Sequence, residues 1–388
     1  MSSKPELVAA RPKIEFVDLA AQQARIRLKI EAAIAKVLAH GHYIMGPEVA
    51  ELERQLSAFC GAKYTLSCSN GTDAMTLVLM AKNVGPGDAV LVPSFTFAAT
   101  AEVVALRGAT PIFLDILPDT FNLDPAQIEA GVAVAKKQNL KPVGIIPVYL
   151  FGLPPDYARI HPLAEKHGLW VMGDAAQGFG SSVNGKFAGS LTQVTTTSFF
   201  PAKPLGCYGD GGAVMTDDAE LFSIMESLRV HGKGMEKYDN VRIGLNARID
   251  TLQAAILMEK LAIFSDELKQ RQRIAAYYSA GLEDVITVPR VPENMISAWA
   301  QYTLLAASVD ARSKIQATLK ESGIPTMIYY PKPLHQQTAY RHFPTATGGA
   351  LTVSEDAAAR VFSLPMHPYL DEATLAYIVA ATRSAIAV

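Results

Sequence analysis

Three short segments of the sequence carry side chains that could bind an anion or react with a carbonyl group. The first is Ser69-Asn70-Gly71-Thr72, which opens a helix predicted over Thr72–Ala81. Free backbone N–H groups, the positive end of the helix dipole and a hydroxyl group are together suited to binding a phosphate. The same residues could also form an ordinary helix cap, so this segment alone leaves both interpretations open.

The second and third segments supply a carboxylate and an amine. Asp174 follows the buried strand pattern Leu169–Met172, at the strand end where open α/β sheets bind their ligands. It could hold a protonated ring nitrogen, a metal or a ribose, or it could cap the next segment. Lys203 stands between Pro201 and Pro204, in an apolar frame that favours the neutral, nucleophilic amine. Most lysines are solvated, so Lys203 too becomes informative only beside the other two segments.

Taken together, the three segments contain what is needed to hold pyridoxal 5′-phosphate. The lysine can bond to the cofactor aldehyde, the aspartate can keep the ring nitrogen protonated, and the helix start can hold the phosphate. Competing motifs are absent, because the sequence contains no GxGxxG, GxxxxGK[ST], HExxH or GxSxG pattern. Its three cysteines, Cys60, Cys68 and Cys207, form no CxxC pair, so we expect no metal site.

Composition places this chemistry in a globular enzyme. The chain has 388 residues, 49% of them hydrophobic, with a net charge of −2. This balance disfavours nucleic acid or a membrane surface as partner, so bound anions must be held by local geometry. No apolar run is long enough to span a bilayer, and the first residues do not resemble a signal peptide. We therefore expect a soluble, cytoplasmic protein.

Alternating strand and helix patterns predict how these residues are positioned. Short apolar runs bounded by Gly, Pro or Asp predict strands at Ala89–Pro93, Pro111–Leu114, Val143–Leu150, Leu169–Met172, Thr195–Phe199 and Ala213–Thr216. A 3.6-residue periodicity predicts helices at Leu19–Leu38, Glu48–Phe59, Thr72–Ala81 and Pro125–Lys137. This order is typical of an α/β fold with a mostly parallel sheet covered on both faces.

The pattern changes after about residue 250. A long helix is predicted over Thr251–Leu282, followed by shorter mixed segments and a last helix near Asp371–Ala387. We expect a large cofactor-binding domain over residues 1–255 and a smaller C-terminal α/β domain over residues 256–388, with the site in the cleft between them.

Several motifs, in order along the chain, resemble the DegT/DnrJ/EryC1/StrS family of nucleotide-sugar aminotransferases. They run from Ile14-Glu15-Phe16-Val17-Asp18-Leu19 to Ser363-Leu364-Pro365-Met366-His367-Pro368, so the resemblance covers nearly the whole chain. Between these ends lie Gly46-Pro47-Glu48, Ser69-Asn70-Gly71-Thr72, Pro93-Ser94-Phe95-Thr96-Phe97, Asp174-Ala175-Ala176-Gln177 and the Lys203 segment. The resemblance implies fold type I of the pyridoxal-phosphate enzymes, which is the aspartate aminotransferase fold, and a homodimer with shared active sites.

The resemblance also implies a role for individual residues. Lys203 would bond to the cofactor and move a proton, Asp174 would pair with the ring nitrogen, and Gln177 would contact the ring hydroxyl. Gly71, Thr72 and Ser198 would bind the phosphate, Phe97 would stack on the ring, and Asn246 would reach the phosphate from the neighbouring subunit. Relatives that act as dehydratases have histidine in place of the lysine, so Lys203 favours transamination.

The sequence departs from the family pattern at two positions. Gly173 and Gly178 replace a more usual glutamate and a small polar residue, respectively. Neither position has an implied role in the chemistry, so we expect changed local packing at most.

The amino acceptor is inferred from two further segments. Residues 18–26 and 198–212 are most similar to the family branch that aminates UDP-2-acetamido-2-deoxy-3-oxo-glucuronate with glutamate, on a route to surface polysaccharide. A uronate carboxylate favours a fixed cation, for which Arg248 is the first candidate and Lys332 the second. Tyr329 and His335 fit the family pattern near the sugar nucleotide. Ion pairs unrelated to substrate are the alternative for the charged residues.

Two other functions stay open at this point. The first is the same chemistry at C4 of a UDP-4-keto-6-deoxy sugar, which has no carboxylate. The second is a non-catalytic regulatory protein on the same fold, against which the presence of Lys203 argues.

Overall fold

A seven-stranded sheet forms the centre of the molecule. The computed structural model describes residues 13–236 and 238–387. The strand order is β1-β9-β8-β5-β4-β2-β3, and β9 runs antiparallel to both of its neighbours while the other adjacent pairs are parallel. The strands are β1 (Tyr64–Cys68), β2 (Asp88–Pro93), β3 (Thr110–Leu114), β4 (Lys141–Ile145), β5 (Trp170–Asp174), β8 (Val194–Ser198) and β9 (Gly212–Thr216). The predicted α/β class with a mostly parallel sheet is confirmed.

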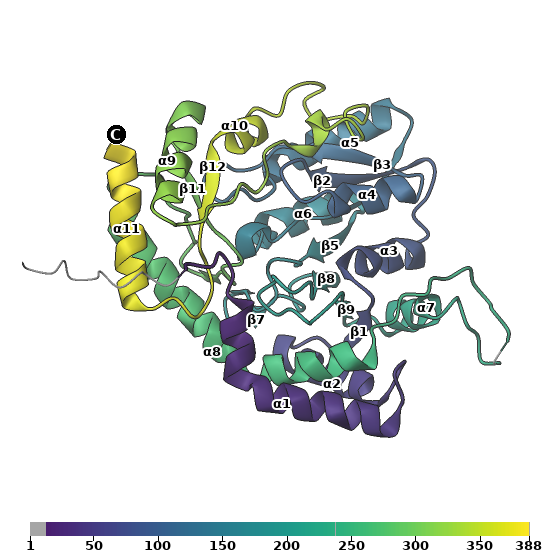
Figure 1. Cartoon of the computed structure of the whole chain (residues 1–388). Coiled ribbons are helices and arrows are strands. Elements are labelled where there is room, and N and C mark those ends of the chain that lie inside the picture. The colour runs from purple at the N-terminus through teal and green to yellow at the C-terminus, as the bar shows by residue number, and fades with distance from the viewer. Residues whose placement is uncertain (1–12, 237, 388) are drawn as a thin grey trace, which may run out of the picture.

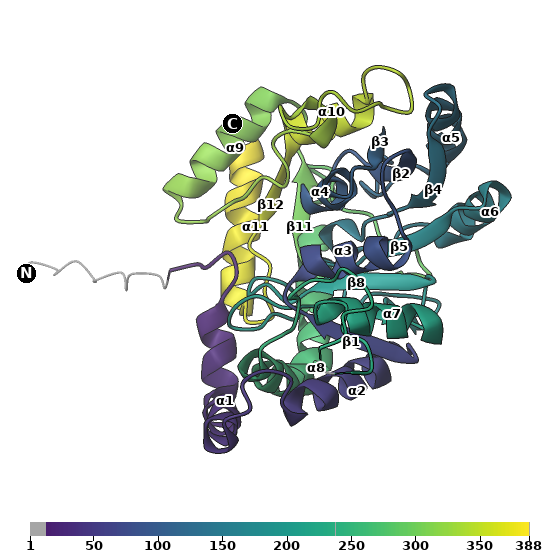
Figure 2. The ribbon, with the colours of Figure 1, turned by 90° about the vertical axis from the view of Figure 1, so that its right-hand side faces the viewer.

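Helices cover both faces of this sheet (Figures 1 and 2). Alternate residues of a strand point to opposite faces, and β2 shows the consequence. Val90 and Val92 pack in a core with α3 (Gly71–Ala81), α4 (Ala99–Leu106) and α7 (Ala219–Arg229). Ala89 and Leu91 pack in another with α5 (Ile128–Lys137) and α6 (Tyr157–His167). Because both faces are buried, the strands consist of nearly continuous apolar runs.

The remaining α-helices lie before and after this sheet in the chain, whereas several short elements lie between its strands. The N-terminal helices are α1 (Leu19–His40) and α2 (Pro47–Cys60). The C-terminal ones are α8 (Thr251–Leu282), α9 (Val309–Glu321), α10 (Thr352–Arg360) and α11 (Glu372–Ala387). Two small sheets pair β6 (Ser182–Val183) with β7 (Lys186–Phe187) and β10 (Met295–Ile296), and β11 (Tyr302–Leu305) with β12 (Val361–Leu364). Three short 3₁₀ turns are η1 (Pro125–Gln127), η2 (Leu150–Gly152) and η3 (Leu334–Gln336).

Most predicted elements lie within two residues of their observed bounds, and α8 has the predicted bounds. The prediction of one strand over Val143–Leu150 is wrong at its C-terminal end, because β4 ends at Ile145 and η2 begins at Leu150. Pro147 lacks the N–H that a continued ladder would need. Strand β1 was not predicted, since its sequence, YTLSC, alternates between polar and apolar residues and lacks a long apolar run.

The long helix α8 contributes to two cores. Its first half places Leu257 and Phe264 in a cluster with α2 and β9, whereas its second half places Ile274 and Tyr278 in a cluster with α9 and α11. The expected boundary at residues 255/256 therefore falls inside one continuous helix, and the division into two domains stays a prediction.

The chain after α9 also returns to the large sheet. Pro344 accepts a hydrogen bond from the Phe113 N–H of β3, and Ala346 donates one back to the Phe113 carbonyl. Next to this strand, the buried Asp115 carboxylate accepts hydrogen bonds from the backbone N–H groups of Val353 and Ser354 at the start of α10, at 2.9 and 2.7 Å. A carboxylate at a helix N-terminus is stabilised by the helix dipole, so this contact fixes α10 on the sheet.

Helix α8 contains a buried lysine, Lys260, which faces Tyr208 in the segment after Lys203. Lys260 is fully buried, its Nζ has no hydrogen-bond partner among the described residues, and it lies 4.2 Å from the centre of the Tyr208 ring. Burial lowers the pKa of Lys260 to about 8, against the opposing charges of Cys207 and Glu267. The cation–π contact with Tyr208 offsets part of this cost.

We predict that Lys260→Met stabilises the protein. Between about pH 8 and 10.5 the unfolded chain holds a proton that the folded one has released, so wild-type stability rises with pH in this window. At pH 7 the cost of the buried charge is fully present, and its removal should raise the free energy of unfolding by on the order of 1–3 kcal/mol.

Urea unfolding of wild type and variant at pH 7 and pH 9 measures both effects. The gain from Lys260→Met should be larger at pH 7 than at pH 9. Lys269→Met, at an exposed position of the same helix, should show neither the gain nor its pH dependence. A loss of stability that is equal at both pH values would contradict the prediction.

Candidate active site

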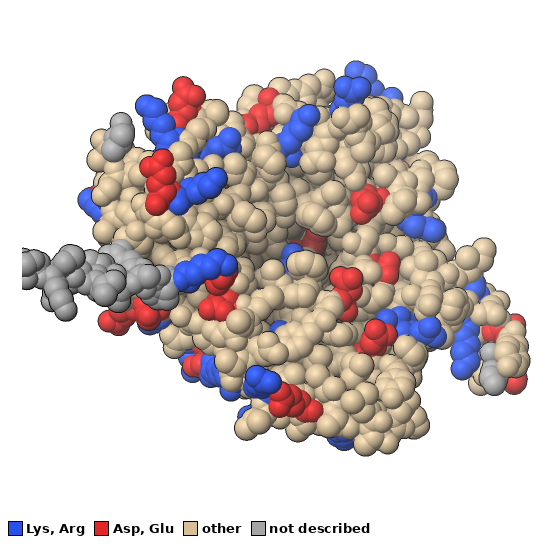
Figure 3. Space-filling model, viewed as in Figure 1, with Lys and Arg blue, Asp and Glu red and all other residues tan. Residues whose placement is uncertain are grey.

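A pocket of about 620 Å³ opens at the carboxyl ends of the sheet strands. It is lined by the residues that follow β1, β2, β5 and β8, together with Gln301, Tyr329 and Tyr330 from the C-terminal part of the chain. On the face shown in Figure 3 the centre is hollowed and mainly uncharged, with most Lys, Arg, Asp and Glu side chains around the rim. The pocket therefore lies where open α/β sheets bind ligands.

The start of α3 forms one wall of this pocket. Asn70 caps the helix by accepting a hydrogen bond from the Asp73 N–H, at 2.8 Å, which leaves Gly71 and Thr72 facing the pocket. Gly71 permits close approach to the end of β8, because a Cβ there would lie 2.8 Å from the Cβ of Ser198. The three predicted phosphate-binding residues, Gly71, Thr72 and Ser198, thus lie together at a helix N-terminus.

Asp174, the last residue of β5, is buried at the base of the pocket. Its Oδ2 accepts a hydrogen bond from the Thr100 hydroxyl at 2.9 Å, and its Oδ1 accepts one from the Ala176 N–H at 3.1 Å. Burial raises the pKa of Asp174, while these two hydrogen bonds and the charge of Lys203 act against the increase. A cationic ring nitrogen beside this carboxylate would supply the additional positive partner that a buried anion requires.

Lys203 lines the same pocket from the segment after β8. Its backbone N–H donates to the Phe200 carbonyl at 2.8 Å, within a tight turn that follows the strand. Burial lowers the pKa of Lys203, and the charge of Asp174 opposes that change. A lowered pKa increases the fraction of neutral amine, which is the form that can attack an aldehyde.

Gln177 and Phe97 complete the set of predicted cofactor residues that the pocket brings together. Gln177 is buried and binds the Tyr330 hydroxyl through Nε2 at 2.9 Å. Phe97 is exposed at the mouth of the pocket, with its ring centre 6.2 Å from that of Tyr330. An aromatic ring at this position can cover one face of a planar ligand.

The two departures from the family pattern share one packing partner. A Cβ at Gly173 would lie 3.0 Å from the Tyr149 ring, and a Cβ at Gly178 would lie 2.3 Å from the Tyr149 Cβ. The fully buried Tyr149 occupies the space that side chains at these positions would need. The expectation that only local packing changes agrees with this arrangement.

Four predicted residues do not line this pocket within the described chain. Lys332 is exposed, and His335 is held by Ser94 Oγ on Nδ1 at 2.6 Å and by Glu355 on Nε2 at 3.0 Å. His335 therefore ties the C-terminal segment to the end of β2. Asn246 and Arg248 contact each other beyond α7. The role of Asn246 at a neighbouring subunit and that of Arg248 in binding the carboxylate stay predictions.

The sequence did not indicate three residues of the site, of which Tyr330 and Gln301 line the pocket and Thr100 lies behind it, bound to Asp174. Thr100 binds Asp174, Tyr330 binds Gln177, and Gln301 brings a buried carboxamide oxygen that has no hydrogen-bond partner among the described residues. Thr100 and Tyr330 lie far in sequence from the motif residues that they bind. The only signal for Tyr330 in the sequence was its position next to Tyr329, which was predicted as a substrate-binding residue.

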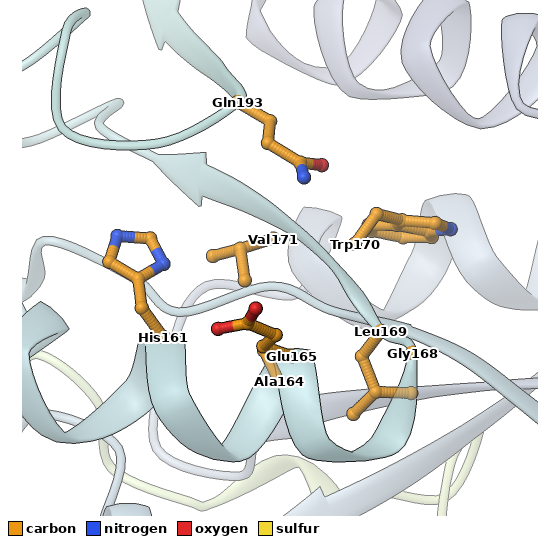
Figure 4. A pocket seen from close by; sticks show the side chains of 8 residues that line it. All are labelled: His161, Ala164, Glu165, Gly168, Leu169, Trp170, Val171 and Gln193. Carbon is orange, nitrogen blue, oxygen red and sulfur yellow. The ribbon is translucent and has the colours of Figure 1, made fainter.

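A second hollow, of about 560 Å³, lies at the opposite end of β5 (Figure 4). Trp170, at the first position of β5, lines it together with His161, Glu165 and Gln193. His161 Nε2 is already hydrogen-bonded to the Leu191 carbonyl at 2.9 Å. No Lys or Arg lines this hollow, so it lacks a cation that could attract an anion. Within residues 13–236 and 238–387 no cluster of His, Cys, Asp and Glu could hold a metal ion.

The residues of the first pocket fit pyridoxal phosphate. The start of α3 faces the pocket with Gly71, which has no side chain. The buried carboxylate of Asp174 requires a cationic partner, and the amine of Lys203, with its lowered pKa, lies beside it. Lys203 would hold the cofactor covalently, Asp174 its ring nitrogen, and Gly71, Thr72 and Ser198 its phosphate.

Comparison with known proteins decides the family. The profile of the DegT/DnrJ/EryC1/StrS aminotransferase family matches residues 24–383. This chain belongs to that family. The cofactor prediction, pyridoxal 5′-phosphate on fold type I, and the prediction of an aminotransferase are thereby confirmed.

Relatives and solved structures agree along nearly the whole length. The chain is 50% identical over 369 residues to the UDP-2-acetamido-2-deoxy-3-oxo-D-glucuronate aminotransferase of Pseudomonas aeruginosa, covering 95% of this chain and 99% of that protein. It is 41% identical to a pleiotropic regulatory protein of Geobacillus stearothermophilus, over 94% of this chain and 96% of that protein. It is 39% identical to a UDP-N-acetyl-3-dehydro-alpha-D-glucosamine 3-aminotransferase of Acidithiobacillus ferrooxidans, over 95% of this chain and 97% of that protein.

Among solved structures, a family aminotransferase from Brucella abortus matches with a TM-score of 0.93 at 52% identity, covering 96% of this chain and 99% of that one. NtdA from Bacillus subtilis with bound PMP, the amino form of the cofactor, matches with a TM-score of 0.89 at 29% identity. The match covers 98% of this chain and 87% of that one.

We predict that Gly71→Ala weakens cofactor binding at least tenfold. The new Cβ would meet the Ser198 Cβ at 2.8 Å, so the start of α3 or the end of β8, which both border the predicted phosphate site, must shift. A loss of about 1.4 kcal/mol corresponds to a tenfold larger Kd. Titration of the apoprotein with pyridoxal phosphate, followed by absorbance, measures this change.

Gly349→Ala is the matched control, because a Cβ at Gly349 meets no atom within 4 Å. Its Kd should equal that of the wild type. Equal Kd values for all three proteins would show that the close approach of Gly71 and Ser198 does not shape the phosphate site.

Proposed function

We propose that this enzyme transfers the amino group of glutamate to C3 of UDP-2-acetamido-2-deoxy-3-oxo-glucuronate. The observation that carries the proposal is the 50% identity, over nearly the full length of both proteins, to an enzyme named for that substrate. A second relative, at 39% identity, is also named for transfer at the 3-position of a UDP-linked 2-acetamido sugar. Position 3 is therefore favoured over position 4.

The chemistry requires a proton to be moved at the carbon that gains or loses nitrogen. The bound cofactor would supply an electron sink for the carbanion that forms there. Lys203, with its lowered pKa, would accept the proton from the donor carbon as a neutral amine and later return one to the sugar carbon. Asp174 would keep the ring nitrogen protonated, with Thr100 and Ala176 fixing the carboxylate.

A uronate carboxylate must be recognised by a cation that the pocket of one chain does not offer. Lys203 is the only cationic side chain among the described residues that line it, and it is needed for the chemistry. Arg248 has a buried Nε that no other described residue hydrogen-bonds, and its Nη2 binds the Asn246 side chain. We propose that Arg248 of a second subunit binds the carboxylate, because a guanidinium group pairs with it through two hydrogen bonds.

The shape of the chain after α7 supports a homodimer with shared sites. The segment that precedes Asn246 projects from the body of the molecule, to the right of α7 in Figure 1. Met235 and Ile243 on this segment are 102% and 92% exposed, respectively. Apolar side chains so fully exposed beside Asn246 and Arg248 would be buried if this segment packed against a second copy.

The proposed substrate also suggests where the enzyme works. Nucleotide sugars for surface polysaccharide are built before export, so we propose a cytoplasmic location. None of the helices in the described part of the chain is long and apolar enough to cross a membrane.

We predict that the enzyme prefers the 3-oxo uronate over a UDP-4-keto-6-deoxy sugar by at least a factor of ten in kcat/KM, with glutamate as donor. A carboxylate paired with Arg248 contributes more than about 1.4 kcal/mol, which is one factor of ten. Coupled assays of 2-oxoglutarate formation with each ketosugar measure the ratio. Equal or better use of the 4-keto sugar would overturn the proposed substrate.

Shared active sites predict complementation between two weak variants. Lys203→Ala should be inactive, and Arg248→Ala should lose most activity toward the uronate. If each site combines Lys203 of one subunit with Arg248 of the other, a mixed dimer contains one intact site, so refolding an equimolar mixture should restore up to about a quarter of wild-type activity. Mixed samples no more active than the sum of the separate variants would exclude sharing.

A further inference from the structure

The side-chain amide of Gln177 is held at both ends. Its Oε1 accepts a hydrogen bond from the Phe151 N–H at 2.7 Å, and its Nε2 donates one to the Tyr330 hydroxyl at 2.9 Å. A backbone N–H can only donate, so the oxygen of the amide must face Phe151 and the nitrogen must face Tyr330. One Nε2 hydrogen is used by Tyr330, and the second remains available to the pocket that Gln177 lines.

The Phe151 end of this arrangement is set by an unusual backbone conformation. Phe151 has φ of +58°, in the left-handed region that residues with a side chain rarely adopt. Its ring packs edge-on against Phe95 and Phe121, which holds the residue in place. A strained backbone conformation persists only where the surrounding contacts hold it in place. In this conformation the Phe151 N–H points at the Gln177 side chain.

The Tyr330 end is supplied by a different part of the chain. Tyr330 lies between α9 and α10, 153 residues away from Gln177 in sequence. Its ring is framed by Phe95, edge-on at 6.3 Å, and by Phe97 at 6.2 Å, so the position of the hydroxyl is defined by packing. Burial raises the pKa of Tyr330, so the hydroxyl stays neutral and can accept the hydrogen bond at working pH.

We propose that Tyr330 is a positioning residue for the cofactor ring, which by accepting one Nε2 hydrogen of Gln177 keeps the other directed at the ring hydroxyl. The proposal concerns the cofactor and does not depend on which sugar is aminated. Without the Tyr330 oxygen, the amide keeps only its contact with Phe151 and can rotate about it. The ring hydroxyl would then lose a well-aligned donor.

The electronic consequence has a definite sign. A donor to the ring oxygen draws negative charge from it, and so weakens the hold of that oxygen on the neighbouring proton of the Lys203 nitrogen. Loss of the donor should therefore make this nitrogen, once joined to the cofactor, bind its proton more tightly. The visible absorbance band of the holoenzyme reports this protonation directly, independently of turnover.

The experiment is a pH titration of the visible band in four holoenzymes with a control. Tyr330→Phe removes one oxygen and should move the midpoint upward by about one pH unit relative to the wild type. Gln177→Leu should move it in the same direction by a similar or larger amount. The double variant should move it no further than Gln177→Leu alone, because Tyr330 acts through Gln177. Tyr329→Phe, at the neighbouring pocket residue, should leave the midpoint unchanged.

Two results would overturn the proposal. The first is an unchanged midpoint in either Tyr330→Phe or Gln177→Leu. If Tyr330→Phe then also bound the cofactor more than tenfold more weakly, Tyr330 would act in binding rather than in alignment of the amide. The second is a pair of shifts that add fully in the double variant.

Discussion

The arrangement of the site depends on one buried carboxylate. Placing Asp174 at the end of the central strand β5 removes it from water, which costs several kcal/mol unless partners compensate. The groups that compensate the buried charge come from three places in the chain. Thr100 lies in the first turn of α4, Ala176 follows β5, and Lys203 follows β8. Three separate elements around the pocket thus help to hold this charge, and a cationic ring nitrogen would add a further positive partner.

A near-neutral chain that binds several anions must concentrate its positive potential. The start of α3 would do so without a basic side chain, through N–H groups that Gly71 leaves accessible. Burial lowers the pKa of Lys203, which would leave its amine free for the reaction rather than for binding an anion. A guanidinium contributed by another subunit would be the simplest way to add charge without placing a second permanent cation beside Lys203.

The sequence predicted those parts of the fold and site that are encoded locally. The buried strands and amphipathic helices have clear periods, and Gly71, Asp174 and Lys203 stand directly beside them. Thr100 and Tyr330 could not be found in this way, because their importance lies in contacts made across 74 and 153 residues of sequence. His335 shows the converse, since its motif suggested substrate binding while folding satisfies both of its ring nitrogens inside the protein.

Two attachments of the C-terminal part lie at opposite edges of the sheet. Helix α8 packs with α2 beside β1 and β9, whereas the segment around Pro344 pairs with β3 at the far edge. A segment that is anchored at both of its ends has fewer conformations than one that is anchored at a single end. Tyr329 and Tyr330 lie in the segment between these two attachments, and both line the pocket. The two anchors therefore lower the conformational entropy that these two pocket residues would lose when a ligand binds.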